Sequence, residues 1–530
     1  MLVFRSTAIT AAVFAVALAV PAAAQQPAAK QCSVDEGQPS EVARAYLTVS
    51  QVASAHGADP ASLKKKLADA VQMLTKSDQH DNPVGHAFEM GKLLVLWTSL
   101  PDVRLTMDRG TLGYATNPKD SINLPAAIDS AFTAVETAMP ECASETQPWR
   151  SQKVWIDLVN ASIQELNAGS LDSADKHATV SLVLNRKAPY GFMVRAQVAS
   201  RRNQLDQAIA LFQQTIAAAS ADTLYAEVRD QSRMNLGNVA RQAADADSTH
   251  ATKYLKIAVE AFRDLSSDTT ATPSYRATAT GGLVDADLTL GDTAAARAIY
   301  QPELTNPKAF SFNQIVQGGV WATQAGDSAG ASTLFHAAYQ MNPYHRDALS
   351  NLALIDLRQQ KFDSALTLLS QLKAVDPNGD NARLWLFTYA GMAKKFADLN
   401  HDIVARFKQS KDQKLKRVLS DSATLTTDSN RVYTELAVNV NTGMDSIPVL
   451  VSFSQFSSQG DSVTLKGTIA NHTDDAKTYT LKVDFLDHAG AVVVSDSTTV
   501  GPVSGHATGQ FALKAAGPGI TAFRYAPVDK

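Results

Sequence analysis

The chain has 530 residues, of which 45% are hydrophobic and 19% are charged, and its formal net charge at pH 7 is −4. This length exceeds what one compact core normally spans, so we expect two to four domains. A chain with a net negative charge lacks the strongly basic face that nucleic-acid binding requires, so the composition argues against a nucleic-acid partner.

The first residues have the three parts of a secretory signal peptide. Arg5 gives a short positive segment, Ala8 to Val20 form an apolar core, and small residues suited to cleavage follow Pro21. The apolar core is too short to span a bilayer comfortably. We therefore expect residues 1–24 to be removed and the chain to be exported, to a bacterial periplasm, the cell surface or the medium, with no integral membrane segment. A retained membrane anchor is the alternative.

Export makes the two cysteines of the chain, Cys32 and Cys142, informative. In an oxidising compartment such a pair most simply forms one disulfide, here predicted to stabilise the fold by about 4–5 kcal/mol. Two unrelated buried thiols are the alternative. A metal site is not expected, because two cysteines so far apart do not have the spacing of zinc ligands.

The body of the chain has a helical pattern. Residues 25–40 predict an extended leader. From residue 41 to about residue 420, Ala and Leu recur three and four residues apart between short Gly, Asp, Asn and Pro breaks. We assign N-terminal helical hairpins to 41–150 and a helical solenoid with a capping helix to 151–400. The polar stretch 401–445 predicts a basic helix and a linker, whose Lys and Arg lie on a solvated face rather than in a binding patch.

The helical body repeats itself about every 34 residues. The clearest copy has small, aromatic and proline residues at Gly319, Gly326, Ala331, Phe335, Ala338 and Pro343. Thirty-four residues later stand Ala353, Gln360, Ala365, Leu369, Leu372 and Pro377. Similar spacings begin upstream at Gly169, Asn203 and Gly291. These positions resemble the tetratricopeptide repeat (TPR), a helix–turn–helix unit of about 34 residues.

The resemblance implies how each unit is built. Gly319 lets the second helix of the pair approach closely, Gly326 and Asp327 end one helix and cap the next, and Ala331 lies where the two helices cross. Because one unit cannot bury its apolar face alone, the copies are expected to stack into a right-handed all-α solenoid.

Members of this family bind an extended peptide or a partner's helix in a concave groove lined by the first helix of each unit. Carried over by position, the residues expected to line this groove are Tyr190, Gln197, Arg201, Asn235, Asn238, Asn313, Gln324, Asp347, Leu354 and Arg358. Arg and Asn side chains can pair with the backbone or the carboxylates of a peptide. The Lys-rich clamp that some members use for C-terminal carboxylates is not reproduced, because Met193 stands where it needs Lys.

The last part of the chain, 446–530, changes character. Val, Thr, Ser and aromatic residues alternate with period two between Gly-, Asp- and Asn-rich turns, which predicts a small all-β sandwich. The stretch from Val483 through Phe485 and Leu486 to Asp487 resembles the name motif of bacterial Ig-like domains of the FxLYD type, with Val and Leu in place of two aromatics.

The pattern GDSAG, Gly326–Gly330, matches G-x-S-x-G, the nucleophile elbow of serine hydrolases. An elbow needs a buried strand immediately before it. The residues before GDSAG are too many and too polar for such a strand, and Ser328 falls in the structural period, since Gly291 and Asp292 occupy the same place one unit earlier. We predict a turn between helices and no catalytic residue at Ser328.

A metal site at His80 and His86 is not favoured either, because a Pro-Gly loop separates them and no third ligand is evident. We expect no metal and no cofactor. The predicted function is a non-enzymatic scaffold or adaptor for a protein or peptide partner, and the oligomeric state is open. The alternatives are a serine hydrolase using Ser328 and a carbohydrate-binding envelope protein, the latter weakened because the β domain contains no Trp.

Overall fold

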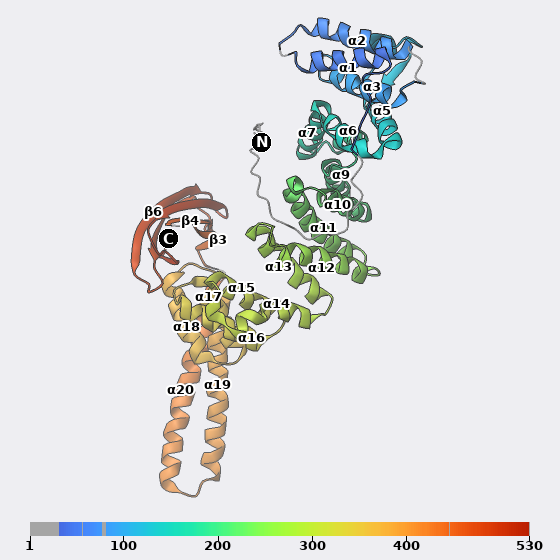
Figure 1. Ribbon diagram of the computed structural model, residues 1–530. Helices are drawn as coiled ribbons and strands as arrows, with labels where there is room; N and C mark the ends of the chain where they lie inside the picture. Colours follow the sequence, from blue (N-terminus) through green and yellow to red (C-terminus); the bar gives the residue numbers. More distant parts are fainter. Residues whose placement is uncertain (1–30, 56, 77–80, 445, 460, 529–530) are drawn as a thin grey trace, which may run out of the picture. The chain divides into compact units, whose positions relative to one another are not determined.

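The computed structural model describes residues 31–55, 57–76, 81–444, 446–459 and 461–528. The predicted signal peptide lies outside these residues. The chain divides into two compact units, the first ending at Val239 and the second beginning at Ala240 (Figure 1).

The first unit is almost entirely helical. Its helices are α1 (Ser40–Ala53), α2 (Pro60–Lys76), α3 (Pro83–Thr98), α4 (Arg109–Leu112), α5 (Leu124–Ala138), α6 (Ala143–Arg150), α7 (Lys153–Asn167), α8 (Leu171–Leu184), α9 (Tyr190–Arg201), α10 (Leu205–Ala219) and α11 (Ala226–Ala246), which contains the boundary. Two short strands, β1 (Thr106–Asp108) and β2 (Ser121–Asn123), pair antiparallel between α3 and α5. The helical pattern did not predict this ribbon.

The segment before α1 is fastened to the helices that follow. Cys32 and Cys142 form the predicted disulfide. The Lys92 ammonium on α3 lies 2.7 Å from a carboxylate oxygen of Glu36, and the Asn82 side chain donates a hydrogen bond of 2.6 Å to a backbone carbonyl of the same segment. The predicted extended leader is thus part of the folded unit over its described residues.

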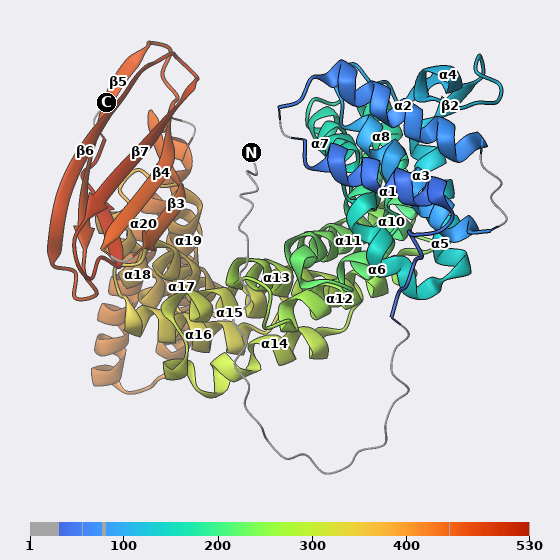
Figure 2. The ribbon, with the colours of Figure 1, turned by 45° about the horizontal axis from the view of Figure 1, so that its top comes forward.

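The second unit continues the helical pairs and ends in a β domain. Its further helices are α12 (Ala251–Ser267), α13 (Pro273–Thr289), α14 (Thr293–Thr305), α15 (Phe312–Gln324), α16 (Ser328–Met341), α17 (Arg346–Arg358), α18 (Phe362–Val375), α19 (Ala382–Gln409) and α20 (Gln413–Met444). Consecutive helices pack as hairpins, α13 with α14, α15 with α16, α17 with α18 and α19 with α20 (Figure 2).

The same backbone turn joins the helices of five pairs. Each turn has one residue in the left-handed conformation, with φ between 58° and 81°: Gly169, Asn203, Gly291, Gly326 and Gln360. At Gly326 the N–H of Asp327 donates to the carbonyl of Ala322 at 2.8 Å and the N–H of Gly326 donates to that of Thr323 at 3.1 Å, which is the Schellman helix end. The Asp327 side chain then caps α16 by accepting from the N–H of Gly330 at 2.9 Å. The predicted turn is confirmed.

The small residue at position 319 has the predicted role. A Cβ atom on Gly319 would lie 2.9 Å from the ring of Phe335, which is fully buried between α15 and α16. The two helices can therefore approach this closely only when the first carries no side chain at this position.

The β domain consists of two antiparallel three-stranded sheets. The strands are β3 (Val449–Gln459), β4 (Ser462–Asn471), β5 (Lys477–Leu486), β6 (Val492–Val503), β7 (Thr508–Ala516) and β8 (Ala522–Tyr525), in the orders β3-β4-β7 and β6-β5-β8. Alternate residues such as Leu465 on β4 and Leu481 and Phe485 on β5 are fully buried between the sheets. The period-two pattern had predicted this arrangement.

The β domain is docked on two equivalent positions of the repeat. Asn342 and Asp376 are the C-terminal capping positions of α16 and α18, one repeat apart. The Asn342 side chain donates to the carbonyl of Thr521 at 3.0 Å, and the Tyr525 hydroxyl donates to the Asp376 carboxylate at 2.6 Å. Burial of this contact raises the pKa of both Asp376 and Tyr525.

The linker predicted within 401–445 is not present. The predicted boundary at residue 400 falls inside α19, and α20 continues as a helix to Met444. Ser and Thr are frequent in α20, and their hydroxyls donate to carbonyls four residues earlier, as Thr426 does to Ser422 at 3.0 Å. Asn400 and Asn430 each donate across the hairpin to a backbone carbonyl at 2.7 Å. Polar residues that predicted a linker therefore hold two long helices together.

Candidate functional site

A cleft of 650 Å³ lies between α13, α14 and α15 in the second unit. Small residues of α13 leave it open, since a Cβ atom on Gly281 would meet no atom within 4 Å. Its wall combines apolar and polar side chains from the other two helices: Ile299, Glu303, Asn313, Gln314, Gln317 and Trp321.

A second cleft, of 470 Å³, lies between α15 and α17 on one side and strands β3 and β8 on the other. Asn313 and Gln317 line both clefts, so the two are continuous along the first helices of successive pairs. We call the combined surface the repeat groove; it is lined by Thr278, Thr280, Gly281, Ile299, Glu303, Phe312, Asn313, Gln314, Val316, Gln317, Trp321, His345, Arg346, Asp347 and the facing residues of β3 and β8.

The repeat groove contains a buried carboxylate. Glu303 is 8% exposed, and its Oε2 atom has no hydrogen-bond partner in the described part of the chain. Burial raises the pKa of Glu303, because the charged form loses its hydration. Because the Oε2 atom is itself buried, a molecule bound in the cleft could donate a hydrogen bond to it only if neighbouring side chains moved aside.

His345 lies at the other end of the repeat groove. Its ring packs on that of Phe312 at a centroid distance of 4.6 Å, and its buried Nδ1 atom has no partner among the described residues. Burial lowers the pKa of His345, which favours the neutral imidazole. Arg346 next to it lies with its guanidinium 4.9 Å from the centre of the Phe453 ring on β3.

Two of the residues predicted from the repeat register, Asn313 and Asp347, line the repeat groove. Gln324, Leu354 and Arg358 lie on α15 and α17 of the same unit but are not among its lining residues. The remaining five lie in the first unit: Tyr190, Gln197, Arg201, Asn235 and Asn238.

In the first unit, Tyr190 packs edge-to-face against Trp155 and Tyr225, at ring distances of 6.2 and 5.7 Å. Arg201, on α9, donates to the carbonyl of Leu166 on α7, the first helix of the preceding pair. These two side chains therefore contribute to packing between one helical pair and the next, and any binding role of theirs remains a prediction.

Several residues of the repeat groove were not predicted. Gln317 and Trp321 follow Asn313 at steps of four, so they share its face of α15 and could have been found from that spacing. Glu303 could not have been predicted in this way. It lies on α14, the second helix of its pair, whereas the repeat register predicts groove residues on first helices only.

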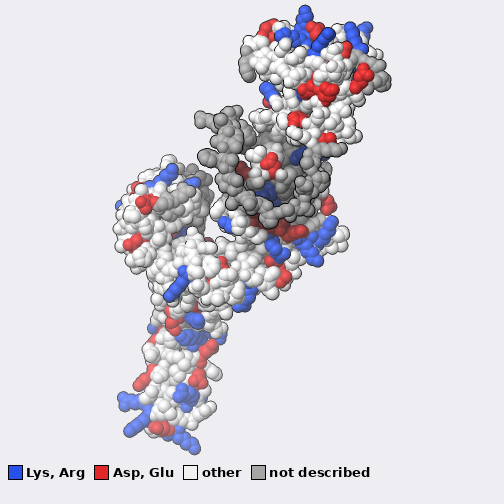
Figure 3. Space-filling view, viewed as in Figure 1, with Lys and Arg blue, Asp and Glu red and all other residues white. Residues whose placement is uncertain are grey.

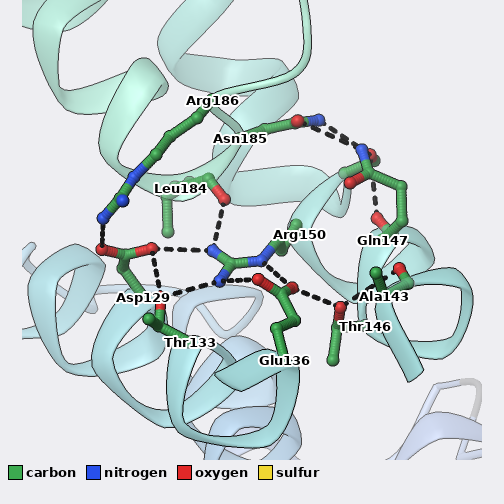
Figure 4. Close-up of polar contacts among 11 residues, drawn as sticks. Asp129, Thr133, Glu136, Ala143, Thr146, Gln147, Arg150, Leu184, Asn185 and Arg186 are labelled. Carbon is green, nitrogen blue, oxygen red and sulfur yellow. Dashed lines mark hydrogen bonds and ion pairs between the residues drawn. The ribbon is translucent and has the colours of Figure 1, made fainter. Parts of the chain in front are cut away.

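A second polar cluster surrounds Arg150 (Figure 4). Arg150 is 6% exposed and makes five hydrogen bonds, to Glu136 twice, to Asp129, to Thr133 and to the carbonyl of Leu184, at 2.8–3.2 Å. A guanidinium has five N–H donors. All of them are used within the protein, so this cluster joins α5, α6 and the end of α8 and leaves no donor for a ligand.

The structure around Ser328 is not a nucleophile elbow. Ser328 is the exposed first residue of α16, and the element before the turn is helix α15, not a strand. His86 bonds through its ring Nε2 to the carbonyl of Leu74 at 2.8 Å, while His80 lies outside the described residues. Across the described ranges, no three His, Cys, Asp or Glu side chains form a group that could hold a metal ion.

Comparison with known proteins identifies the repeats. Residues 322–387, which span α16 to α18, match the family model of the tetratricopeptide repeat. No curated protein matches the sequence. Similar solved structures include pilF of Pseudomonas aeruginosa, at 14% identity over 42% of this chain and 91% of that one, with a TM-score of 0.28.

Two other similar structures are described as tetratricopeptide repeat proteins. One, from Parabacteroides merdae, is 11% identical and covers 52% of this chain and all of its own, with a TM-score of 0.30. The other, YrrB, is described as having an unusual peptide-binding site; it is 17% identical over 37% of this chain and 90% of its own, with a TM-score of 0.25. The chain thus contains tetratricopeptide repeats over residues 322–387, within a series of helical pairs that is followed by a small β domain.

Proposed function

We propose that this chain is an exported, non-enzymatic scaffold that binds a protein partner through an extended segment lying in the repeat groove. The tetratricopeptide fold supports a protein–protein interaction scaffold in general. The observation that carries the proposal for this groove is the buried carboxylate of Glu303, whose Oε2 atom has no partner within the described residues.

A buried acceptor without a partner lowers the stability of the free protein, by about 1–3 kcal/mol in typical cases. A ligand that donates a hydrogen bond to Glu303 removes that cost on binding. The amides of Asn313, Gln314 and Gln317 can each donate and accept, as the backbone of an extended peptide requires. Trp321 adds an apolar wall. The preferred ligand is therefore an extended peptide with a Lys or Arg side chain that reaches Glu303.

Two observations support export, the signal-peptide pattern and the disulfide. The signal-peptide pattern precedes the described residues, and Cys32 and Cys142 form a disulfide, which persists in oxidising compartments. Among the described helices, none has both the length and the apolar character needed to cross a membrane. The Ig-like character of the β domain is part of the same proposal, since the resemblance to FxLYD-type domains rests on sequence alone.

The test is to block the repeat groove without disturbing the fold. Gln317→Arg places a long charged side chain where the two clefts meet, and Gln340→Arg introduces the same side chain at an exposed position of α16 outside the lining residues. Proteins captured from envelope extracts are compared by mass spectrometry for the wild type and both variants. The strongest partner is then titrated against each by calorimetry.

We expect Gln317→Arg to weaken the identified partner at least tenfold and Gln340→Arg to leave its affinity within a factor of two of the wild type. A partner that binds all three proteins equally well would show that the repeat groove is not its binding site.

A further inference from the structure

The helical hairpin α19–α20 ends in a strongly basic tip. Figure 3 shows Lys and Arg side chains gathered at the free end of this hairpin, away from the repeat helices of the same unit. Between residues 406 and 417 the chain carries six basic side chains and one acidic residue, Asp412, a net charge of +5. The six are Arg406, Lys408, Lys411, Lys414, Lys416 and Arg417.

The acidic side chains of the described residues leave these positive charges unpaired. Asp412 accepts hydrogen bonds from the backbone N–H groups of Lys414 and Leu415, at 2.8 and 3.3 Å, so its carboxylate caps the first turn of α20. Within the described part of the chain, none of the six basic side chains forms an ion pair. Lys416 lies 5.3 Å from the centre of the Phe407 ring. The positive field of the tip is therefore directed at the solvent.

Apolar side chains accompany the charges. Leu415 and Val418, on the first turns of α20, are 42% and 60% exposed, and Leu425, one heptad after Val418, is 68% exposed. Spacings of three and seven place these residues on one side of the helix. They are exposed because near the tip each helix of the hairpin packs against only the other one.

We propose that the tip of the α19–α20 hairpin docks on the surface of an anionic phospholipid bilayer. Lys and Arg near such a surface contribute about 1 kcal/mol each to binding. Exposed apolar residues such as Leu415 and Val418 can enter the boundary between headgroups and acyl chains. This proposal does not depend on the repeat groove or on its partner.

Charge chemistry and geometry favour a lipid surface over an acidic protein. Four of the six cations are lysines, which are flexible point charges suited to a diffuse negative field, whereas recognition of individual carboxylates favours the rigid fork of arginine. The cations also come from both helix ends and from the short connection between them. At 1.5 Å per residue, the 28 residues of α19 span about 42 Å, so the tip can touch a flat surface while the helix base stays away from it.

The experiment measures binding of the purified protein to vesicles of phosphatidylcholine alone and of phosphatidylcholine with 30% phosphatidylglycerol (about one anionic lipid in three) by co-sedimentation. The tip variant combines Lys408→Gln, Lys411→Gln and Lys414→Gln. The control variant combines Lys65→Gln, Lys66→Gln and Lys76→Gln, three exposed lysines of α2. Both variants lose the same net charge, and circular dichroism verifies that each is folded.

We expect the wild type and the control variant to bind the anionic vesicles and not the neutral ones, with binding that weakens as salt is raised. The tip variant should bind about 100-fold more weakly. Replacing Leu415 and Val418 by Ser should weaken binding about tenfold and leave its salt dependence unchanged.

Two outcomes would overturn the proposal. One is equal binding of anionic vesicles by the tip and control variants. The other is absence of vesicle binding by the wild type while an acidic polypeptide, poly-glutamate, binds through the same three lysines, which would assign the tip to an acidic protein instead.

Discussion

Two buried charged residues in this molecule, Arg150 and Glu303, differ in how completely the protein satisfies their hydrogen bonds. Arg150, in the first unit, uses all five of its N–H donors within the protein, and its partners come from α5 and α8. Glu303, in the second unit, lies in a cleft with an acceptor atom that has no partner among the described residues. A charge whose bonds are complete holds helices together. A charge whose bonds are incomplete costs stability, and a ligand can remove that cost.

Glu89 lies between these extremes. One oxygen of its carboxylate is 2.6 Å from the Lys92 ammonium, and the other is buried without a partner in the described ranges. Burial raises the pKa of Glu89 to about 7, although the charge of Lys92 acts in the opposite direction. The three residues thus form a series from a fully paired charge to an unpaired one, and each step of the series can be tested.

The largest effect is expected at the fully paired charge. Arg150→Met leaves Asp129 and Glu136 without their main cation, so we expect the free energy of unfolding of the first unit to fall by about 3–5 kcal/mol. Hydrogen exchange of α5 and α6 at increasing urea measures this loss. Arg186→Met is the matched control, because Arg186 also pairs with Asp129 but its side chain is 65% exposed, and it should cost less than about 1 kcal/mol. Equal losses in the two variants would refute the structural role of the buried network.

The next effect is a pH dependence at Glu89. Its pKa in the folded protein, about 7, is above its ordinary value of 4.5, so its contribution to stability is fully present below pH 4.5 and is lost as pH rises through 7. We expect the first unit to lose roughly 1–3 kcal/mol over this range. Glu89→Gln should remove this slope, whereas Glu36→Gln, at the more exposed carboxylate, should keep most of it. Thermal unfolding measured between pH 4.5 and 7 tests this prediction. If stability depended on pH in Glu89→Gln as it does in the wild type, Glu89 would not be the titrating group.

The smallest effect on stability, with the opposite sign, is expected at Glu303. Because burial penalises its charged form, Glu303→Gln should stabilise the second unit by about 1 kcal/mol at neutral pH. The same variant should weaken the partner of the repeat groove at least tenfold, since it removes the charge that receives the donor. Glu260→Gln, at an exposed position of α12, should change neither quantity. Stabilisation of Glu303→Gln without loss of binding would separate Glu303 from partner recognition.

The turns between helices could be predicted from the sequence because their cause is local. A residue with positive φ is needed where each first helix ends, and Gly meets that need without strain at Gly169, Gly291 and Gly326. Asn203 and Gln360 adopt the same conformation without being Gly, and they were found because the 34-residue spacing placed them. The 34-residue spacing and the positive φ angles thus indicate the same turn positions.

The features that escaped prediction depend on contacts between distant residues. The polar composition of α20 predicted a linker, because Ser, Thr and Asp also suit loops; the bonds from Asn400 and Asn430 across the hairpin exist only once α19 lies beside it. Of the residues predicted to bind a partner, Asn313 and Asp347 line a cleft, and their binding role stays a prediction. The buried carboxylate of the repeat groove was not predicted. Glu303 is buried because three helices meet around it, and no local sequence pattern indicates such a contact.

The docking of the β domain on Asn342 and Asp376 constrains how this architecture can grow. A duplicated unit inserted before α15 would lengthen the array and leave both docking residues the same distance apart. A duplication between them would double their separation and detach one side of the β domain, although each new unit would fold normally. The number of repeats can therefore change upstream of α15 but not between α16 and α18, so the repeat array can vary in length only at its upstream end.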